Sequence, residues 1–383
     1  MKRRYYFDWA AAALPDAAPL NAAANPFGNP SSKHAEGREA RAALEDARRR
    51  CAAVLGAAPE EIFFSSGGTE SNAIVLNSLL LRQNRPGCGG LLVSAAEHPS
   101  VKETAAVLER LGKSLTLIGV EKDGRVSEET LEGALKKARD PRMAAVMAVN
   151  NESGAVTDIP TIAKLLREQA GAPIHFHCDI VQAVGKMPVD LRAWDVDSAS
   201  LSAHKLGGPR GIGVLYLRKP LEVLCTGGGQ EGRIRPGTEN TAGALALAEC
   251  LERRARPETA GVGYEEAAAR WKTLIAALKD LPRCVLIPGD RMEEDGRFSP
   301  YILQAAFRGI PGEVMARALD DEGFAVSTGS ACSSGSRERP VLAAMGVDKT
   351  TAFEGIRISQ GWHTSGEDIE ALIEGIKRIL RAL

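Results

Sequence analysis

A single lysine, Lys205, occupies a position where a solvated lysine is not expected. It ends the stretch Ser200-Leu201-Ser202-Ala203-His204-Lys205, and two glycines follow Leu206. This pattern predicts the end of a strand that opens into a tight turn. A surface lysine is the ordinary interpretation of such a stretch, so a chemical role requires partners elsewhere in the chain. An amine that condenses with a carbonyl cofactor needs an electron sink held around it.

A carboxylate, Asp179, ends an apolar strand pattern 26 residues before Lys205. A carboxylate at the carboxyl end of a buried strand is costly unless it is paired, which indicates a cationic partner. A protonated pyridine nitrogen is such a partner. An aspartate followed by a lysine about one strand, loop and strand later is the arrangement by which an enzyme keeps pyridoxal 5'-phosphate protonated and anchored.

A glycine-rich turn, Ser66-Gly67-Gly68-Thr69, follows a strand pattern at 62–65 and precedes a helix that begins near Thr69. Glycines let the backbone approach an anion closely, and a helix amino terminus offers unpaired N–H groups. Taken alone, a glycine turn that only caps a helix is the commoner structure. Together with Asp179 and Lys205, the turn predicts a phosphate cradle.

Further motifs run through most of the chain in a fixed order. They are Phe27-Gly28-Asn29-Pro30-Ser31-Ser32, Ser66-Gly67-Gly68-Thr69-Glu70-Ser71-Asn72, Glu97-His98, Val149-Asn150-Asn151-Glu152, Asp179 with Gln182, Ser202 with His204-Lys205, Gly227-Gly228-Gly229-Gln230-Glu231, Arg235, Gly237-Thr238-Glu239-Asn240, Ser330-Ala331-Cys332 and Ile356-Arg357-Ile358-Ser359. In these motifs and their order the sequence resembles the cysteine desulfurases of aminotransferase class V, specifically the group that supplies iron–sulfur cluster assembly.

The resemblance implies a role for each matching position. Lys205 would hold pyridoxal 5'-phosphate as a Schiff base and move the substrate Cα proton, while Asp179 would keep the pyridine nitrogen protonated. The other cofactor contacts would be His98 on the ring face, Gln182 and Asn151 on the phenolic oxygen side, and Gly68, Thr69, Ser202 and His204 on the phosphate. Thr238 would reach the phosphate of a neighbouring subunit, which implies a homodimer.

Arg357 lies in a short apolar strand pattern, where an unpaired guanidinium would be expensive. A substrate carboxylate held by two parallel hydrogen bonds would satisfy it. An internal salt bridge is the alternative. By the resemblance, Arg357 and Asn151 would bind the substrate.

Cys332 lies in a polar stretch rich in serine and glycine, 327–336, unlike the apolar surroundings of a buried cysteine. Such a loop can expose a thiol and carry it. By the resemblance, its thiolate would take the sulfur of a bound L-cysteine, form a persulfide and release alanine. The serine-rich loop is typical of the first group of the family. A reactive thiol without a catalytic role is the alternative.

Strand and helix patterns alternate through the first two thirds of the chain. The strand patterns cover 62–65, 91–94, 114–120, 144–149, 174–179, 198–202 and 213–217, and helices begin near Thr69, Pro99, Ser127 and Ile159. This alternation predicts an α/β fold with a mainly parallel seven-stranded sheet, helices on both faces, and ligands at the carboxyl ends of the strands. The resemblance implies fold-type I of the pyridoxal phosphate-dependent transferases.

Two domains are predicted. Residues 14–255 would form the large cofactor-binding domain, and residues 1–13 and 256–383 would form a smaller α+β domain that carries the Cys332 loop. The segment 5–30 has the composition of an irregular arm. The closing helix has a capping box at Thr364 and Glu367 and one apolar stripe that includes Leu380 and Leu383.

Composition narrows the class of protein. The chain has 383 residues, is 44% hydrophobic and has a formal net charge of −1, which is typical of a globular protein with room for two domains. Its apolar runs fall short of the roughly 20 residues that span a bilayer. Seven scattered cysteines without a Cys-x-x-Cys pair argue against disulfides and a metal site. We expect a cytoplasmic enzyme without nucleic-acid or membrane partners, and the resemblance implies a sulfur-acceptor protein such as an iron–sulfur scaffold.

Two departures from the family pattern affect the expected contacts. The run Asp8-Trp9-Ala10-Ala11-Ala12-Ala13 replaces the usual polar residues of the arm, and Gly232-Arg233-Ile234 has fewer arginines than the family. Two other functions remain open. One is a selenocysteine lyase or another class V enzyme. The other is a catalytically silent scaffold of a sulfur-transfer complex, which the presence of Lys205, Asp179, His98 and Cys332 disfavours.

Overall fold

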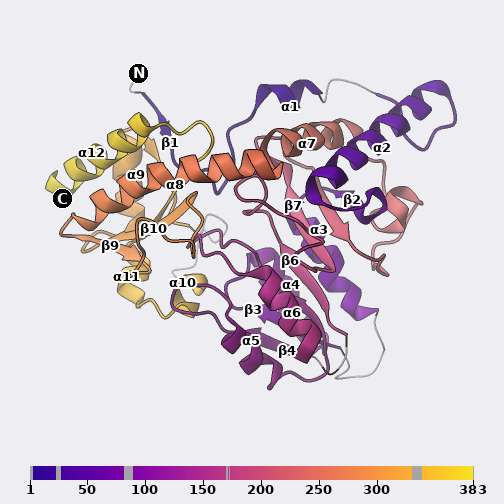
Figure 1. Cartoon of the computed structure of the whole chain (residues 1–383), viewed down its shortest axis with the longest axis horizontal. Coiled ribbons are helices and arrows are strands. Elements are labelled where there is room, and N and C mark those ends of the chain that lie inside the picture. The colour runs from indigo at the N-terminus through magenta and orange to yellow at the C-terminus, as the bar shows by residue number, and fades with distance from the viewer. Residues whose placement is uncertain are drawn as a thin grey trace.

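The central sheet confirms the predicted α/β architecture. The computed structural model describes residues 3–22, 27–81, 89–169, 171, 173–329 and 339–382. Within these ranges, seven strands form a sheet of order β2-β8-β7-β6-β5-β3-β4 (Figure 1). They are β2 (Ile62–Ser65), β3 (Gly90–Ser94), β4 (Leu115–Ile118), β5 (Pro141–Ala145), β6 (His175–Asp179), β7 (Ser198–Ser202) and β8 (Gly213–Leu217). In this sheet β8 runs in the opposite direction to the other six strands.

Most of the predicted strands match the structure, but one is displaced. The strand expected at 144–149 lies at Pro141–Ala145. Beyond Ala145 the backbone still donates hydrogen bonds to the neighbouring strand, from Val146 to the His177 carbonyl and from Ala148 to the Asp179 carbonyl. The apolar run therefore marks buried backbone that continues past the end of the regular strand.

Helices cover both faces of the sheet, and its strands are therefore buried on both sides. One core contains Phe64, Leu92 and Phe176 and is covered by α2 (Ala35–Leu55), α5 (Glu128–Leu135), α6 (Ile159–Gln169) and α7 (Thr241–Arg254). The opposite core contains Phe63 and Leu91 and is covered by α3 (Gly68–Asn77) and α4 (Pro99–Arg110). Successive strand residues point to opposite faces, so adjacent apolar residues enter different cores.

A second body contains the carboxyl-terminal part of the chain. Its antiparallel sheet has the order β12-β10-β9, formed by Gly355–Ser359, Ile302–Phe307 and Cys284–Ile287. The helices α8 (Pro257–Lys279), α9 (Gly312–Asp321) and α12 (Gly366–Ala382) pack on it, with α10 (Pro340–Ala344) and α11 (Lys349–Glu354) beside it. Figure 1 shows α8 running from α7 into this body, close to the predicted boundary at residue 256. The exact domain limits stay a prediction.

The last helix has the predicted apolar stripe but a different cap. Ile369, Leu372, Ile373, Ile376 and Ile379 are buried, and Leu380 is partly buried. Leu383 lies outside the described residues. The reciprocal capping bonds join Ser365 and Asp368, one residue after the predicted pair of Thr364 and Glu367. Thr364 instead accepts a hydrogen bond from the Gly361 N–H.

The amino-terminal arm has more regular structure than its sequence predicts. Strand β1 (Tyr5–Tyr6) pairs in parallel with β11 (Phe324–Ala325), and α1 (Ala17–Ala22) follows. Between them the arm crosses from the small body to the large one, where the Ala13 and Asp16 N–H groups donate to the carbonyls of His204 and Gly207. Among the helices described, none is both long and apolar enough to cross a membrane.

Candidate functional site

Lys205 lies where the large sheet meets the amino-terminal arm. It ends the 3₁₀ turn η3 (Ala203–Lys205), which follows β7 directly. Its Nζ donates to the carbonyl oxygens of Ala10 and Ala11, the latter at 2.8 Å. The predicted turn at a strand end is therefore confirmed. The arm contributes to the site through its backbone, which explains how a run of alanines can serve there.

Asp179 ends β6 and is 5% exposed. Its Oδ1 accepts a hydrogen bond from the Val181 N–H at 3.0 Å, and its Oδ2 accepts one from Asn72 Nδ2 at 3.0 Å. In the described part of the chain, two N–H donors rather than a cation hold this carboxylate. The cationic partner that the sequence predicts for Asp179 would therefore come from a ligand.

His98 is the N-cap of α4 and precedes Pro99. Its Nδ1 accepts a hydrogen bond from the Ser100 N–H at 3.1 Å and lies 2.8 Å from Ser100 Oγ. Burial lowers the pKa of His98; the charge of Asp179 opposes this effect and that of Lys205 adds to it. The neutral imidazole is thus held at a helix start, close to both charged groups of the site.

The residues predicted to bind the phosphate lie on two segments that are distant in sequence. Gly67 has a φ of +148°, a conformation that favours glycine, and α3 begins at Gly68 with no side chain of the described residues capping it. Ser202 Oγ lies 2.7 Å from His204 Nδ1 and would lie 3.3 Å from a Cβ on Gly67. Thr69 is in the first turn of α3.

His204, beside Ser202, has a neutral ring. Burial lowers the pKa of His204 to about 4, and the nearby charge of Lys205 acts in the same direction. A neutral imidazole can donate one hydrogen bond and accept another. The carboxyl ends of β2 and β7, which lie on either side of β8 in the sheet, therefore supply glycine backbone, a hydroxyl and an imidazole.

Gln182 connects the arm to a lysine that the sequence analysis did not single out. Its Nε2 donates to the Ala10 carbonyl at 2.9 Å, and its Oε1 accepts from Lys186 Nζ. Lys186 is 3% exposed, and burial lowers the pKa of its amine to about 7, with the charges of Lys205 and Arg357 adding to the effect. A lysine after a glycine gives no sequence signal for burial, which is why it was missed.

Arg357 has a carboxylate partner within the chain. Its Nη2 donates to Asp8 Oδ1 at 2.8 Å, and its Nη1 donates to the backbone carbonyl of Asn151 at 2.9 Å. The internal salt bridge, which the sequence left as the alternative, is therefore present. Arg357 is 3% exposed, and its Nε is buried without a partner among the described residues. The structure thus joins Arg357 to Asn151 and to the arm.

One predicted residue lies apart from this cluster, and another cannot be placed. Thr238 is exposed, in the segment before α7. Cys332 lies outside the described residues, so its placement stays a prediction. The segment that carries it leaves the described part of the chain after Gly329, and Ser327 nearby exchanges backbone hydrogen bonds with Arg357.

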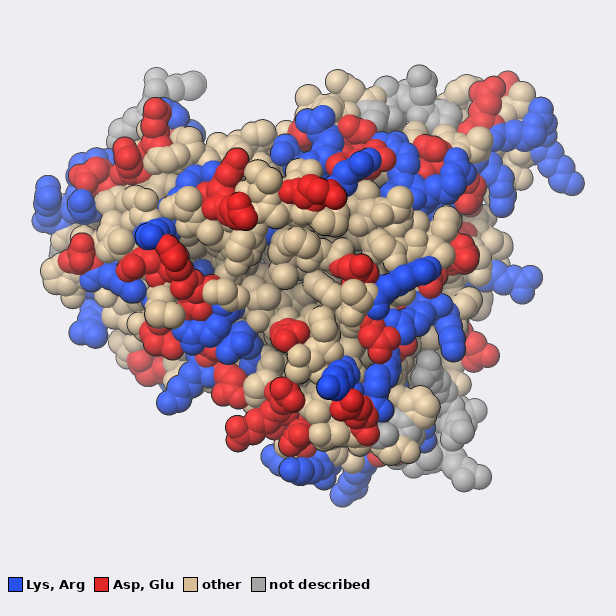
Figure 2. All heavy atoms as spheres, in the orientation of Figure 1, with Lys and Arg blue, Asp and Glu red and all other residues tan. Residues whose placement is uncertain are grey.

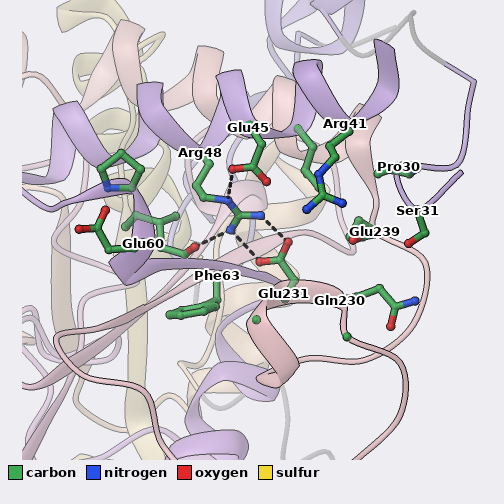
Figure 3. A pocket seen from close by; sticks show the side chains of 15 residues that line it. Pro30, Ser31, Arg41, Glu45, Arg48, Glu60, Phe63, Gln230, Glu231 and Glu239 are labelled. Atoms are coloured by element: carbon green, nitrogen blue, oxygen red, sulfur yellow. Dashed lines mark hydrogen bonds and ion pairs between the residues drawn. The ribbon is translucent and has the colours of Figure 1, made fainter. Parts of the chain in front are cut away.

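A surface groove of about 700 Å³ lies elsewhere, between α2 and the loop around Glu231. Figure 3 shows Arg48 pointing to Glu231 across its floor. The Arg48 Nη2 to Glu231 Oε1 distance is 2.7 Å, and both side chains are buried. Glu231, Gly232 and Arg233 all have positive φ angles, so the departure from the family pattern at 232–234 lies in a kinked segment of the backbone. The groove shares no residue with the Lys205 cluster.

Comparison with known proteins identifies the family. Residues 5–372 match the model for the class-V aminotransferases. The chain is 36% identical to "Cysteine desulfurase IscS" of Dictyoglomus turgidum, covering 100% of this chain and 96% of that protein. It is 39% identical to the protein of the same name from Aeromonas hydrophila, covering 92% and 85%.

Solved structures agree with the sequence relatives. A structure titled "NIFS-LIKE PROTEIN" is 32% identical, has a TM-score of 0.90 and covers 99% of this chain and 100% of its own. A NifS-like protein from Rickettsia africae has a TM-score of 0.85 at 27% identity, covering 99% and 100%. The predicted fold class is therefore confirmed, and the chain belongs to the class-V aminotransferase family, among its cysteine desulfurases.

Proposed function

We propose that this protein is a pyridoxal 5'-phosphate-dependent L-cysteine desulfurase. It would convert L-cysteine to L-alanine, transfer the sulfur to Cys332 as a persulfide and pass it to an acceptor protein such as an iron–sulfur scaffold. The observation that carries the proposal is the meeting of Lys205, Asp179 and His98 at the carboxyl edge of the sheet, in a chain whose full-length relatives are named cysteine desulfurases. A homodimer and a cytoplasmic location belong to the same proposal.

The residues present fit the cofactor. Asp179 is a buried carboxylate with two N–H donors and no cation among the described residues, which suits a protonated pyridine nitrogen. At the other end, a Cβ on Gly68 would meet Val181 Cγ2 at 2.8 Å, so only glycine leaves the α3 amino terminus open. Asp179, Lys205, Gln182, Ser202, His204 and Thr69 would hold the group. When bound, it supplies an electron sink for the pair of electrons released at the substrate Cα.

Lys205 would bind the cofactor covalently and then move protons. Its amine is held by two backbone carbonyls of the arm, which can accept hydrogen bonds but cannot take the proton. As an ammonium, Lys205 has no lone pair, so it would have to leave these carbonyls and lose a proton before its nitrogen could accept the substrate Cα proton. The arm therefore orients the amine without neutralising it.

Arg357 would bind the substrate carboxylate. The guanidinium is planar and has five N–H donors, of which Asp8 and the Asn151 carbonyl use two in this structure. A cysteine carboxylate would share this guanidinium with Asp8 or displace it. Because the Asn151 backbone binds the same group, Asn151 would lie beside the bound substrate.

Cys332 would accept the sulfur. Its thiolate would attack the sulfur of the bound cysteine, forming an S–S bond while the substrate Cβ–S bond breaks. The electron pair of the broken bond would stay on carbon, which is protonated to give alanine. The outer sulfur of the persulfide would then pass to an acceptor thiol, or leave as sulfide when a thiol reductant is present.

The test is to incubate the purified holoenzyme with L-cysteine and dithiothreitol and to measure alanine and sulfide together. We expect equal amounts of both products and a persulfide on Cys332 by mass spectrometry. Cys332→Ala should lose nearly all activity, because removing a covalent nucleophile costs several orders of magnitude in rate. Cys225→Ala is the control, since Cys225 is a free, exposed thiol. Sulfide release by Cys332→Ala at the original rate would show direct elimination instead.

The same assay separates the remaining alternatives. A selenocysteine lyase would release alanine from selenocysteine far faster than from cysteine. A silent scaffold would bind no cofactor, so the purified protein would lack the yellow colour of a lysine Schiff base.

A further inference from the structure

Asn72, on α3, uses its whole side-chain amide in hydrogen bonds and is 1% exposed. Its Oδ1 accepts from His177 Nε2 at 2.8 Å and from Ser200 Oγ at 2.6 Å. Its Nδ2 donates to Asp179 Oδ2 at 3.0 Å and to Ser100 Oγ at 2.9 Å. An amide has two acceptor sites and two donor protons, so all four are occupied.

The partners fix the direction of every bond. An ionised Asp179 can only accept, so the amide nitrogen must face it and the amide oxygen must face His177. His177 therefore donates from Nε2. Burial lowers the pKa of His177 to about 3, so the ring is neutral and its Nδ1 accepts from Ser198 Oγ at 2.8 Å. Reversing the amide would place its oxygen against the Asp179 carboxylate, where no proton is available.

Two branches of hydrogen bonds lead from the Asn72 amide: one goes directly to Asp179, and the other goes through Ser100 to His98. Ser100 Oγ accepts from Asn72 and lies 2.8 Å from His98 Nδ1; since the Ser100 backbone N–H makes Nδ1 an acceptor, the hydroxyl proton is directed to it. The backbone N–H of Ser100 donates to the same nitrogen at 3.1 Å. A neutral imidazole whose Nδ1 accepts must carry its proton on Nε2.

We propose that Asn72 is a positioning residue that orients two groups of the active site at once. It holds the Asp179 carboxylate directly, and through Ser100 it holds the His98 imidazole with its proton on Nε2. His98 then presents an N–H donor to the ligand, not a lone pair. This inference rests on the proposed function only for the identity of the ligand that Asp179 and His98 contact.

The test uses the full-length protein without cofactor, labelled with ¹⁵N-histidine. The chain has six histidines, and the His98 signal is identified from its loss in His98→Gln. Solid-state ¹⁵N spectra distinguish a protonated ring nitrogen from an unprotonated one. We expect His98 and His177 each to be protonated at Nε2 only. A proton on His98 Nδ1 would overturn the inference.

Two variants test the two branches by titration with pyridoxal 5'-phosphate. Asn72→Leu should shift the His98 Nδ1 resonance and raise the cofactor dissociation constant about tenfold to a hundredfold, because hydrogen bonds to a charged group are among the strong ones. Ser100→Ala should shift the His98 resonance but change the dissociation constant by less than about twofold, since the Asp179 branch remains. Asn77→Leu, at the half-buried end of the same helix, is the control and should change neither.

Asn72→Asp is a second variant that allows the test to be made if Asn72→Leu does not fold. It keeps the size of the side chain but places an oxygen against Asp179, so cofactor binding should weaken at least as much as in Asn72→Leu. Wild-type cofactor affinity in both Asn72 variants would overturn the inference. Failure of the desulfurase assay would not, because the spectra are recorded without cofactor or substrate and report the hydrogen bonds alone.

Discussion

Glu97, beside His98, is a buried acid with a raised pKa. It is 1% exposed; its Oε1 accepts from the Met147 N–H at 2.6 Å, while its Oε2 is buried without a partner among the described residues. Burial raises the pKa of Glu97 from 4.5 to about 8, and the charge of Asp179 adds to the effect. At neutral pH this side chain is therefore a neutral carboxylic acid.

We predict that Glu97→Gln changes the pH dependence of stability. Between pH 4.5 and about 8 the folded protein binds a proton that the unfolded chain releases, so this group stabilises the fold below pH 4.5 and that stability is lost as pH rises through about 8. The slope is at most about 1.4 kcal/mol per pH unit. Glutamine keeps the acceptor for Met147 and removes the titration, so urea unfolding from pH 5 to 8 should show a smaller decline. An unchanged decline would mean that Glu97 titrates normally.

A second residue-scale prediction concerns Lys205→Ala. This change should abolish the visible absorbance of the cofactor and reduce turnover by several orders of magnitude, because no other amine replaces the Schiff-base nitrogen. Spectra and alanine release measure both effects. Lys219→Ala, which removes an exposed lysine after β8, should behave as wild type. A variant that kept the wild-type spectrum would contradict the assignment of Lys205.

At the scale of elements, the arm links the two bodies at the site. Trp9 is 2% exposed; its Nε1 donates to the Tyr6 carbonyl at 3.0 Å, and its ring packs edge-on against Trp362 at 5.7 Å. The residues on either side of it contact residues of the candidate site. Asp8 pairs with Arg357, and the Ala10 carbonyl accepts from Lys205 and Gln182. The packing of one tryptophan thus sets the positions of several site groups.

Gly361→Ala should therefore act on the site through the arm. A Cβ at this position would lie 2.0 Å from Trp9 Cδ2, so the ring must shift. We expect a loss of about 1–3 kcal/mol in unfolding free energy, as for other overpacked cores, and a higher KM for cysteine as Asp8 and Ala10 move. Gly366→Ala is the control, because a Cβ there meets nothing within 4 Å. Destabilisation without any change in KM would show that the arm does not position the site.

The elements also show what a sequence can predict. The strands at 62–65, 198–202 and 213–217 have the predicted limits because short apolar runs between turn residues define them. The hydrogen bonds that the arm accepts from Lys205 and Gln182 were not predictable, because backbone carbonyls accept them and alanine side chains give no sequence signal for such bonds. The internal partner of Arg357 lies 349 residues away, at Asp8, and no local pattern connects the two. The placement of Lys186 likewise depends on long-range packing.

At the scale of the whole molecule, charge gives little indication of a nucleic-acid partner. Figure 2 shows Lys and Arg side chains interspersed with Asp and Glu on the face drawn, consistent with the net charge of −1. Two exposed residues, Phe27 and Thr238, are more informative about a protein partner. Phe27 is 91% exposed at the start of a family motif, and Thr238 is exposed as well. Both positions suit contact with a second copy of the chain.

We predict that Thr238 completes the cofactor site of the other subunit, and mixed dimers can test this. Thr238→Ala should raise the dissociation constant of pyridoxal 5'-phosphate about tenfold or more, because a hydrogen bond to the charged phosphate is lost. A dimer of one Lys205→Ala chain and one Thr238→Ala chain, isolated through two different affinity tags, contains one lysine able to give the visible absorbance. That lysine belongs to the Thr238→Ala chain.

If threonine acts across the interface, the site with this lysine receives an intact Thr238 from the other chain, and titration should give the wild-type midpoint. If Thr238 serves its own subunit, the same site lacks it, and the midpoint should equal that of the Thr238→Ala homodimer. The dimer of wild-type and Lys205→Ala chains provides the reference midpoint in both cases. A site shared between subunits requires both chains to remain associated during binding. Failure of the two tagged chains to purify together would therefore contradict the prediction.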